Sequence, residues 1–181
     1  RQMCIRDRCS ICTGEQVAGF VHPDGHFEDV QLIRTPQELA AFRTRYGIDV
    51  SSFQGEINWD AVADDNIDFA MVRVGFRGTG TGSLNTDKYY EQNIRGAMRA
   101  GLETGVYFFA QAVTVEEAIE EADYVISLLD GLDIDGPIAY DWEMHDSTYR
   151  VYGTSPEMAT ACAVAFCERI KDAGYTPMVY G

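Results

Sequence analysis

Residues 138–143 have the sequence Ile-Ala-Tyr-Asp-Trp-Glu, an apolar run that ends in two acidic residues separated by one position. Such a run is typical of a buried β-strand that gives way to a loop. Because residues two apart on a strand point to the same face, Asp141 and Glu143 project together where this strand ends. Their Cβ atoms are then about 7 Å apart, and two ionised carboxylates at that distance repel each other. The repulsion raises the pKa of one of them, as a general acid requires, although a solvated strand end has the same spacing.

Short β-rich runs alternate with amphipathic helical patterns on both sides of this segment, from Tyr46 onward. We expect strands at 47–50, 69–74, 106–110, 138–142 and 178–180, and helices at about 59–66, 87–100, 115–130 and 156–173. Gly101 after the second helix and Gly174 after the fourth support these boundaries. The alternation predicts a parallel sheet covered by helices, either a barrel or a doubly wound sheet. A barrel needs eight strands to close, so five strands predict an open sheet or the first part of a barrel.

The first 45 residues follow a different pattern. The opening residues show neither a signal-peptide core nor a helical or strand period, so we exclude residues 1–12 as a foreign or processed segment. Residues 13–45 are expected to lead into the main domain. They contain an alternating stretch at 27–33 that is compatible with one strand. Thr35-Pro36-Gln37-Glu38 resembles a capping box and predicts a short helix to about Arg45.

Charge and composition exclude several classes of function. The chain has 29 acidic and 14 basic residues and a formal net charge of −15, a field that repels phosphate backbones and anionic lipids. No apolar run reaches the roughly 20 residues that a membrane helix needs. The five cysteines have no regular spacing, and the pair Cys9 and Cys12 lacks a second pair for zinc. We therefore expect no nucleic-acid partner, no membrane insertion and no cysteine-based metal or redox site.

A third acidic residue, Asp49, lies near the end of the first expected strand. Parallel strands bring their carboxyl ends to one rim, so Asp49 is expected to join Asp141 and Glu143 there. A rim built from several strand ends is how barrel enzymes assemble a site. The three acids are therefore our candidates for catalysis.

The segment 47–55, Gly-Ile-Asp-Val-Ser-Ser-Phe-Gln-Gly, followed by Ile57-Asn58-Trp59, resembles the opening signature of glycoside hydrolase family 25, the lysozymes that cleave bacterial peptidoglycan. Further resemblances follow in the order of the family: Asp68-Phe69-Ala70, Arg73-Val74-Gly75, Asp87-x-x-Tyr90-x-x-Asn93, Ala100-Gly101, Gly105-Val106-Tyr107-Phe108-Phe109 and Asp141-Trp142-Glu143. Each motif is weak by itself. The ordered set, which spans Tyr46 to Gly181, is specific.

The resemblance implies an α/β fold, a TIM-like (β/α) barrel of five βα units and three further strands, which this sequence would follow to about the fifth strand. Residues 46–181 would then be part of a glycoside hydrolase barrel domain. The resemblance also implies hydrolysis of the β-1,4 bond between N-acetylmuramic acid and N-acetylglucosamine, with Glu143 as general acid. Asp141 would assist and Asp49 would lie on the opposite rim. We expect Asp141, deeper on the strand, to stay ionised.

Candidate substrate-binding residues lie at or near strand ends. Sugar rings stack on aromatic faces, which favours Tyr107, Phe109 and Trp142, although most aromatic residues belong to a core. The family resemblance also implies a place for Tyr107 in the cleft. Gln54 and Arg73 are either hydrogen-bonding groups at the rim or interior anchors.

Other chemistries fit poorly. The glycine-rich segment 78–82 lacks the ending of a phosphate-binding loop and is expected to be a flexible rim loop. His145 among acidic residues has no known ligand spacing, and no nucleophile elbow is present. We therefore expect no metal and no cofactor. The partner would be bacterial cell-wall glycan, bound by a monomer that is secreted or associated with the cell wall. The alternatives are a chitinase-like, substrate-assisted glycosidase and a non-catalytic carbohydrate-binding relic.

Overall fold

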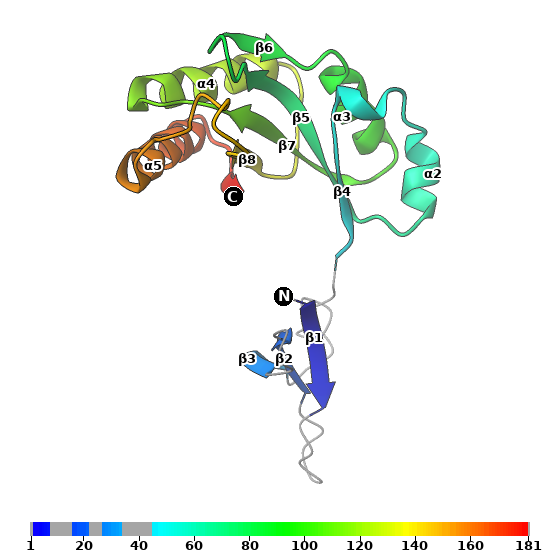
Figure 1. Cartoon of the computed structure of the whole chain (residues 1–181). Helices are drawn as coiled ribbons and strands as arrows, with labels where there is room; N and C mark the ends of the chain where they lie inside the picture. Colours follow the sequence, from blue (N-terminus) through cyan, green and yellow to red (C-terminus); the bar gives the residue numbers. More distant parts are fainter. Residues whose placement is uncertain (1, 8–15, 22–26, 34–44, 181) are drawn as a thin grey trace. The chain divides into compact units, whose positions relative to one another are not determined.

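The central element of the fold is a sheet of five parallel strands in the unit that spans residues 46–181. The computed structural model describes residues 2–7, 16–21, 27–33 and 45–180. The five strands lie side by side in the order β4 (Gly47–Val50), β5 (Phe69–Arg77), β7 (Glu103–Ala110), β8 (Ile138–Trp142) and β9 (Pro177–Tyr180) (Figure 1). All five predicted strands are confirmed. Among the described residues β4 and β9 do not pair with each other, so the α/β sheet is open and no barrel closes.

Within residues 46–180, one strand was not predicted, and β1 (Gln2–Asp7) and β2 (Gln16–Val21) were also not predicted in the residues before it. β6 (Leu84–Thr86) pairs antiparallel with the end of β5, which continues to Arg77 beyond an irregularity between Arg73 and Gly75. The loop that joins β5 to β6 turns the chain back on itself. β6 has only three residues, and no hydrophobic alternation could reveal so short a strand from the sequence.

Four helices connect the strands: α2 (Trp59–Asp64), α3 (Tyr90–Arg99), α4 (Val115–Leu128) and α5 (Pro156–Asp172). Side chains of Asn58, Thr114 and Ser155 cap the first, third and fourth of them. We expected α3 to begin near residue 87, but Asp87 holds other partners and the helix begins at Tyr90. A 3-10 turn, η1 (Ser52–Gln54), follows β4 directly.

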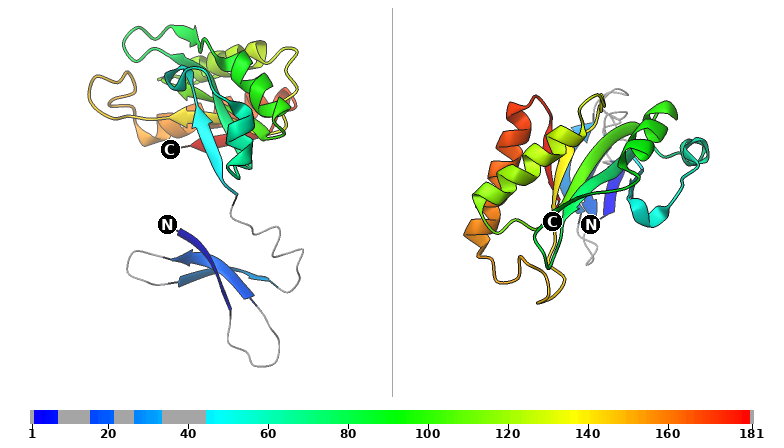
Figure 2. Two further views of the ribbon diagram at one scale, coloured as in Figure 1. Left: turned by 90° about the vertical axis from the view of Figure 1, so that its right-hand side faces the viewer. Right: turned by 90° about the horizontal axis from the view of Figure 1, so that it is seen from above.

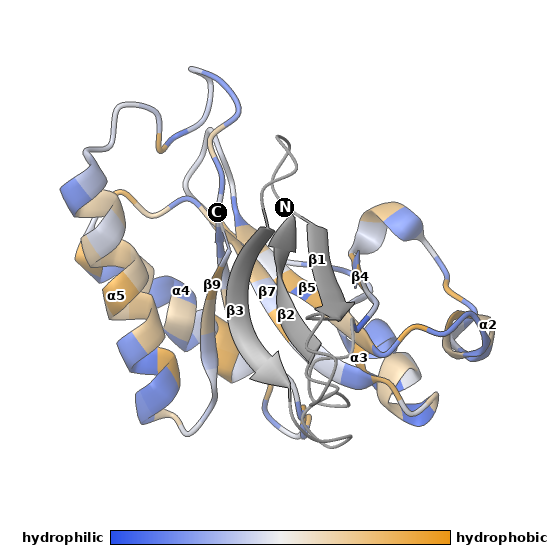
Figure 3. Ribbon diagram, turned by 90° about the horizontal axis from the view of Figure 1, so that it is seen from below, coloured by the Kyte–Doolittle hydropathy of each residue, from blue (hydrophilic) through white to orange (hydrophobic). Residues whose placement is uncertain are grey.

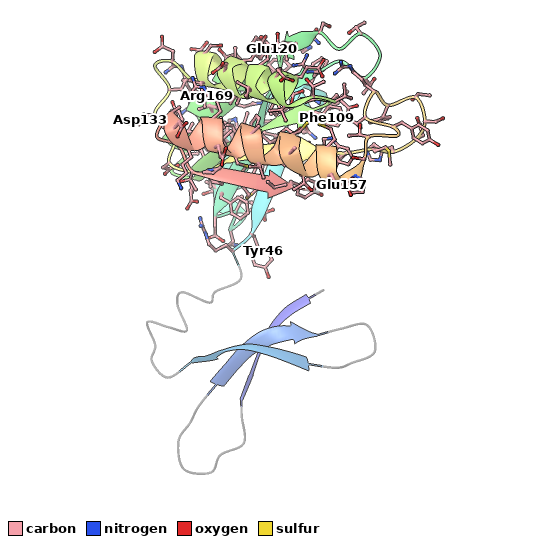
Figure 4. All side chains as sticks on the ribbon, turned by 90° about the vertical axis from the view of Figure 1, so that its left-hand side faces the viewer. Tyr46, Phe109, Glu120, Asp133, Glu157 and Arg169 are labelled. Carbon is pink, nitrogen blue, oxygen red and sulfur yellow. The ribbon has the colours of Figure 1, made fainter. Side chains whose placement is uncertain are left out.

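The hydrophobic core lies between the sheet and these helices. Alternate residues of β5 and β7 are fully buried on the side where α3 and α4 pack, and α5 covers β8 and β9 in the same way. The ring centroids of Tyr140 on β8 and Phe166 on α5 are 4.8 Å apart, so Tyr140 belongs to this core. Figure 2 shows α4 and α5 side by side, and the ribbon colours in Figure 3 show hydrophobic and hydrophilic residues alternating along both helices. Asp123 and Arg169 bridge the two helices with an ion pair of 2.6 Å, and Figure 4 labels Arg169 on α5.

The unit formed by residues 1–45 contains a three-stranded antiparallel sheet. Its strands are β1 (Gln2–Asp7), β2 (Gln16–Val21) and β3 (Phe27–Ile33), paired in that order. The strand at 27–33 is confirmed, whereas our statement that the opening residues have no strand character is wrong for Gln2–Asp7. Strand formation depends on cross-strand neighbours as much as on a segment's own pattern, so pairing with β2 can outweigh a weak period. The helix expected at 35–45 lies outside the described residues, except for Arg45. Within the described part of the chain, no helix is long and apolar enough to cross a membrane.

Candidate active site

A cavity of about 600 Å³ lies on the inner face of the parallel sheet, opposite the helices. Its lining includes all three candidate acids, Asp49 from β4, Asp141 from β8 and Glu143 from the loop that follows. In the sheet β4 and β8 are separated by β5 and β7, so a shared cavity requires the sheet to curl. The structure thus brings the three acids together at the carboxyl end of the parallel strands, as the sequence argument predicted.

Asp141 is the most buried carboxyl of the three. It is only 8% exposed, and its Oδ1 atom is buried without a hydrogen-bond partner among the described residues. Burial, followed by the charges of Glu143 and Asp49, raises the pKa of Asp141 to about 7, against the opposing effect of Arg73 and His145. We expected Asp141 to stay ionised, and this expectation is wrong below about pH 7. The strand position that makes Asp141 deep also removes the water that would stabilise its charge.

Glu143 lies where the strand has ended, and its side chain is 31% exposed. One of its carboxylate oxygens is 2.9 Å from Nε2 of His145. His145 in turn makes an edge-on contact with the ring of Tyr149, at 5.3 Å between centroids. Glu143 is therefore the acid of the pair that a ligand in the cavity can reach more easily, and His145 is a neighbour that sequence reasoning assigned no role.

Arg73 both lines the cavity and anchors its wall. Its guanidinium donates to Asp87 Oδ2 at 2.8 and 3.0 Å and to Ser52 Oγ at 3.2 Å, which ties β5 to η1. Although desolvation acts in the opposite direction, hydrogen bonds from the backbone N–H groups of Ser52 and Tyr89 and from Arg73 lower the pKa of Asp87. The positive charge of Arg73 is thus paired with the buried carboxylate of Asp87. Arg73 does not neutralise Asp141.

Gln54 also lines the cavity, but its side-chain oxygen is occupied. It accepts hydrogen bonds from the backbone N–H of Ser51 at 2.8 Å and from the Ser51 hydroxyl at 3.2 Å. The first of these bonds is one half of a capping box, whose other half is the bond from the backbone N–H of Gln54 to the Ser51 side chain, and the box holds η1 in place. The sequence left two roles open for Gln54. The hydrogen bonds of its side-chain oxygen make it an interior anchor, and its place in the cavity lining also puts it near a bound ligand.

The aromatic candidates separate into two groups. Tyr107 and Phe109 of β7 line the cavity. Burial is the largest of the effects that raise the pKa of Tyr107 to about 12, so its hydroxyl stays protonated and can donate a hydrogen bond. Trp142 is not among the residues that line this cavity, and it packs against the hydrophobic core. Side chains alternate along β8, so Asp141 on the inner face places Trp142 on the helix side.

Residues 48–181 match the family model of the glycosyl hydrolases family 25. The chain belongs to this family. The strand motifs that carried the sequence resemblance are therefore family 25 motifs, and the open parallel sheet corresponds to this part of the family fold.

Two relatives that are named as lysozymes match part of this chain. Lysozyme M1 of Streptomyces globisporus is 32% identical over 112 residues, which cover 60% of this chain and 36% of that protein. The autolytic lysozyme of Clostridium acetobutylicum is 29% identical over 98 residues, which cover 54% of this chain and 28% of that protein. The chain thus spans about a third of the length of these relatives.

Solved structures agree with the family assignment. The modular autolysin LytC from Streptococcus pneumoniae superposes with a TM-score of 0.65 and 27% identity, over 90% of this chain and 37% of that chain. A muramidase from Trichobolus zukalii gives a TM-score of 0.62 and 25% identity, over 76% of this chain and 65% of that chain. The two structures share the sheet and its helices with this chain.

Gln111 is a residue beside the candidate site that sequence reasoning missed. It follows β7 directly, is fully buried, and donates a hydrogen bond of 2.9 Å from Nε2 to the backbone carbonyl of Glu143. Its backbone N–H donates to Glu121 Oε1 at 3.1 Å, and its carbonyl accepts from Arg150 at 3.0 Å. A buried amide directly after an apolar strand was the signal available in the sequence, but only the fold shows what it holds.

The described residues contain no cluster of three or more histidine, cysteine or acidic side chains arranged to hold a metal ion. His145 contacts Glu143 and the ring of Tyr149.

Proposed function

We propose that this chain forms the catalytic centre of a lysozyme-type peptidoglycan hydrolase, which cleaves the β-1,4 bond between N-acetylmuramic acid and N-acetylglucosamine. The observation that carries the proposal is the convergence of Asp49, Asp141 and Glu143 on one cavity of a family 25 sheet. The names of the relatives, lysozymes and an autolysin, support the substrate class. A second LytC structure, named as a complex with a synthetic peptidoglycan ligand, supports it further.

The proposed mechanism uses the two neighbouring carboxyls as a coupled pair. Near neutral pH the pair holds one proton, because burial and mutual repulsion oppose a double negative charge. Glu143 is the more exposed of the two, so it delivers the proton to the glycosidic oxygen as the bond to the sugar breaks. Asp141 then carries the negative charge beside the oxocarbenium-like centre, or orients the acetamido group of the sugar.

Asp49 and the aromatic residues complete the proposed site. Asp49 faces the pair from β4 and adds negative charge on the other side of the cavity. The Tyr107 hydroxyl donates to a polar group of the sugar, and the Phe109 ring packs on an apolar sugar face. Gln54 and Arg73 hold the wall against which the glycan lies.

The remaining proposals concern the setting of the enzyme. The substrate lies in the bacterial cell wall, so we expect a protein that is secreted or associated with the wall and acts as a monomer. We place the catalytic unit at residues 46–181, with residues 13–45 leading into it, and β1 joins this lead-in by pairing with β2. The division of the chain between Arg45 and Tyr46 supports the start of the catalytic unit.

The experiment that tests the function measures reducing ends released from purified peptidoglycan and from chitin. We expect release from peptidoglycan alone, and a loss of about 10³-fold in turnover for Glu143→Gln, because the amide cannot donate the proton. Glu168→Gln, an exposed glutamate on α5, is the matched control and should retain full activity. Release from chitin would favour the chitinase-like alternative. Glycan binding without any release of reducing ends would favour the non-catalytic relic.

A further inference from the structure

His145 lies two residues beyond the proposed proton donor, on the loop that joins β8 to α5. Its ring nitrogen Nε2 is 2.9 Å from Oε2 of Glu143. Glu143 lines the catalytic cavity, whereas His145 is not among the lining residues, and its side chain is 62% exposed. The histidine therefore contacts the acid from outside the space that the glycan would occupy.

A row of aromatic rings holds the imidazole of His145. The ring of Tyr149 meets the imidazole edge to face, and it meets the ring of Phe109 in the same way, at 6.3 Å between centroids. Phe109 belongs to β7, so the row leads from the sheet to the histidine. Edge-to-face contacts favour one relative orientation of the two rings. The orientation of the imidazole is thus set by the sheet as well as by its own loop.

The backbone on both sides of His145 is also held. Gln111 donates from Nε2 to the carbonyl of Glu143, and the Gln111 carbonyl accepts from Arg150 at the other end of this part of the loop. Between these ends, the Asp146 carboxylate accepts from the backbone N–H of Thr148 at 2.8 Å and from its hydroxyl at 2.6 Å. The loop therefore has a defined shape around the contact between His145 and Glu143.

This contact determines which oxygen of Glu143 can carry a proton. A neutral imidazole with its hydrogen on Nε2 donates to Oε2 of Glu143, and an oxygen that accepts this bond is not the protonated one. The proton of the carboxyl then resides on Oε1, and the bond to Oε2 restrains rotation of the group. A general acid must be placed within hydrogen-bond reach of the atom that it protonates, so such a restraint favours the reaction.

The charge of His145 acts on the other carboxyl of the pair. His145 and Arg73 both oppose the effects that raise the pKa of Asp141. An imidazole changes its charge near neutral pH, whereas a guanidinium does not. The ionisable groups around this pair come from β4, β5, β7, β8 and the loop: Asp49, Arg73, Tyr107, Asp141, Glu143 and Asp146.

We propose that His145 is a positioning residue for the proton donor, which it holds through Oε2 of Glu143 so that Oε1 presents the proton to the glycosidic oxygen. The proposal rests on the proposed function, because it takes Glu143 as the donor. It gives His145 two separable effects. The N–H group should govern turnover, and the positive charge should govern the pH at which Asp141 titrates.

The test measures the release of reducing ends from peptidoglycan by the full chain across the pH range. His145→Ala should lower kcat about tenfold with little change in KM, because Glu143 is present but less firmly held. His145→Gln should restore kcat to within about threefold of the wild type, because its amide N–H can donate to the same oxygen. In both variants the limb near pH 7 should move to higher pH, because the charge that opposes protonation of Asp141 is lost.

Met144→Ala is the matched control for the loop. Met144 is exposed between Glu143 and His145 and is not among the residues that line the catalytic cavity. Its replacement should leave kcat and the pH profile unchanged. Wild-type turnover in His145→Ala, or equal losses in the Ala and Gln variants, would overturn the inference and leave the proposed function in place. A rise in KM at constant kcat would do the same, since it would assign His145 to glycan binding.

Ring-nitrogen NMR of His145 tests the contact without turnover. At about pH 9 an imidazole is neutral and a carboxylate only accepts, so Nε2 of His145 should carry the hydrogen in the wild type. In Glu143→Ala the ring should return to a mixture of tautomers, and the signals of Nε2 and Nδ1 should move toward each other. Identical signals in the two proteins would overturn the inference whatever the activity. A wild type that releases no reducing ends would overturn the proposed function and this inference together.

Discussion

Two acidic clusters lie at the carboxyl end of the sheet, and they differ in their counter-charges. The catalytic cluster, Asp49, Asp141 and Glu143, lines the inner cavity, where the nearest arginine is committed to Asp87. The α4 cluster consists of Glu117, Glu120 and Glu121 and is held by two arginines, Arg77 and Arg150. The same kind of residue thus serves two purposes. Where arginines match the acids, the cluster holds loops together. Burial nevertheless raises the pKa of Glu121 to about 7, against the hydrogen bonds from Arg77 and Gln111, as burial does for Asp141. The two clusters therefore differ in their ion pairs and in their access to a ligand.

Removal of Arg77 should have the largest effect on the α4 cluster. Arg77 is 4% exposed and Glu121 is fully buried, so Arg77→Met leaves a carboxylate in the core without its cation. We expect a loss of about 3 kcal/mol in the free energy of unfolding, measured by urea denaturation. Arg95→Met removes an exposed i,i+4 pair with Glu91 and is the matched control, with a loss below about 0.5 kcal/mol. Equal losses for both variants would contradict the distinction between the clusters.

The α4 cluster could not be predicted from the sequence, whereas the catalytic cluster could. Asp141 and Glu143 are two residues apart on one strand, and the strand-end rule added Asp49. Arg77 and Glu121 are 44 positions apart, and nothing local signals that they meet. The same limit applies to β6, which forms because β5 runs on to Arg77. Trp142 is a different case, because strand alternation alone assigns it to the face opposite Asp141, where it packs against the core. Hydrophobic periodicity predicts the helices and strands and the buried face of each. The partners of buried charges can be identified only from the three-dimensional fold.

Replacement of Asp141 tests the catalytic cluster. Asp141→Asn removes the charge that repels a carboxylate at Glu143, so the pair releases its proton at lower pH. We expect turnover on peptidoglycan to fall by about 10- to 100-fold. The wild type should lose activity as the pH rises through about 7, where Asp141 titrates, and in the variant this limb should move to lower pH. An unchanged limb would show that another group controls the reaction.

Gln111 connects the two clusters, because its backbone N–H contacts Glu121 and its side chain contacts the Glu143 carbonyl. Gln111→Leu has a similar size, and the Gln111 Oε1 atom has no partner among the described residues, so the stability cost should be small. We expect kcat to fall about tenfold with little change in KM, because the proton donor is held less firmly while the glycan still binds. A rise in KM at constant kcat would instead indicate a role in substrate binding.

The smallest expected effect concerns the exposed edge of the α4 cluster, where Arg150 pairs with Glu117. The hydrogen bond from Arg150 is the largest of the effects that lower the pKa of Glu117 to about 2. Because the folded pKa lies below the unfolded one, the pair stabilises the protein above about pH 4.5 and loses this contribution as the pH falls toward 2. The pair is about a quarter exposed, so Arg150→Gln should cost less than about 1 kcal/mol at pH 7.

Arg150→Gln should also flatten the acid limb of stability between about pH 4.5 and pH 2, as followed by thermal unfolding over that range. Arg169→Gln, which removes the exposed pair with Asp123 between α5 and α4, is the control. Asp123 is about half exposed, so this control should leave the limb in place. A limb that stays equally steep in Arg150→Gln would show that other carboxyls, not Glu117, govern acid unfolding. The α4 cluster would then differ from the catalytic cluster in its contacts but not in its response to pH.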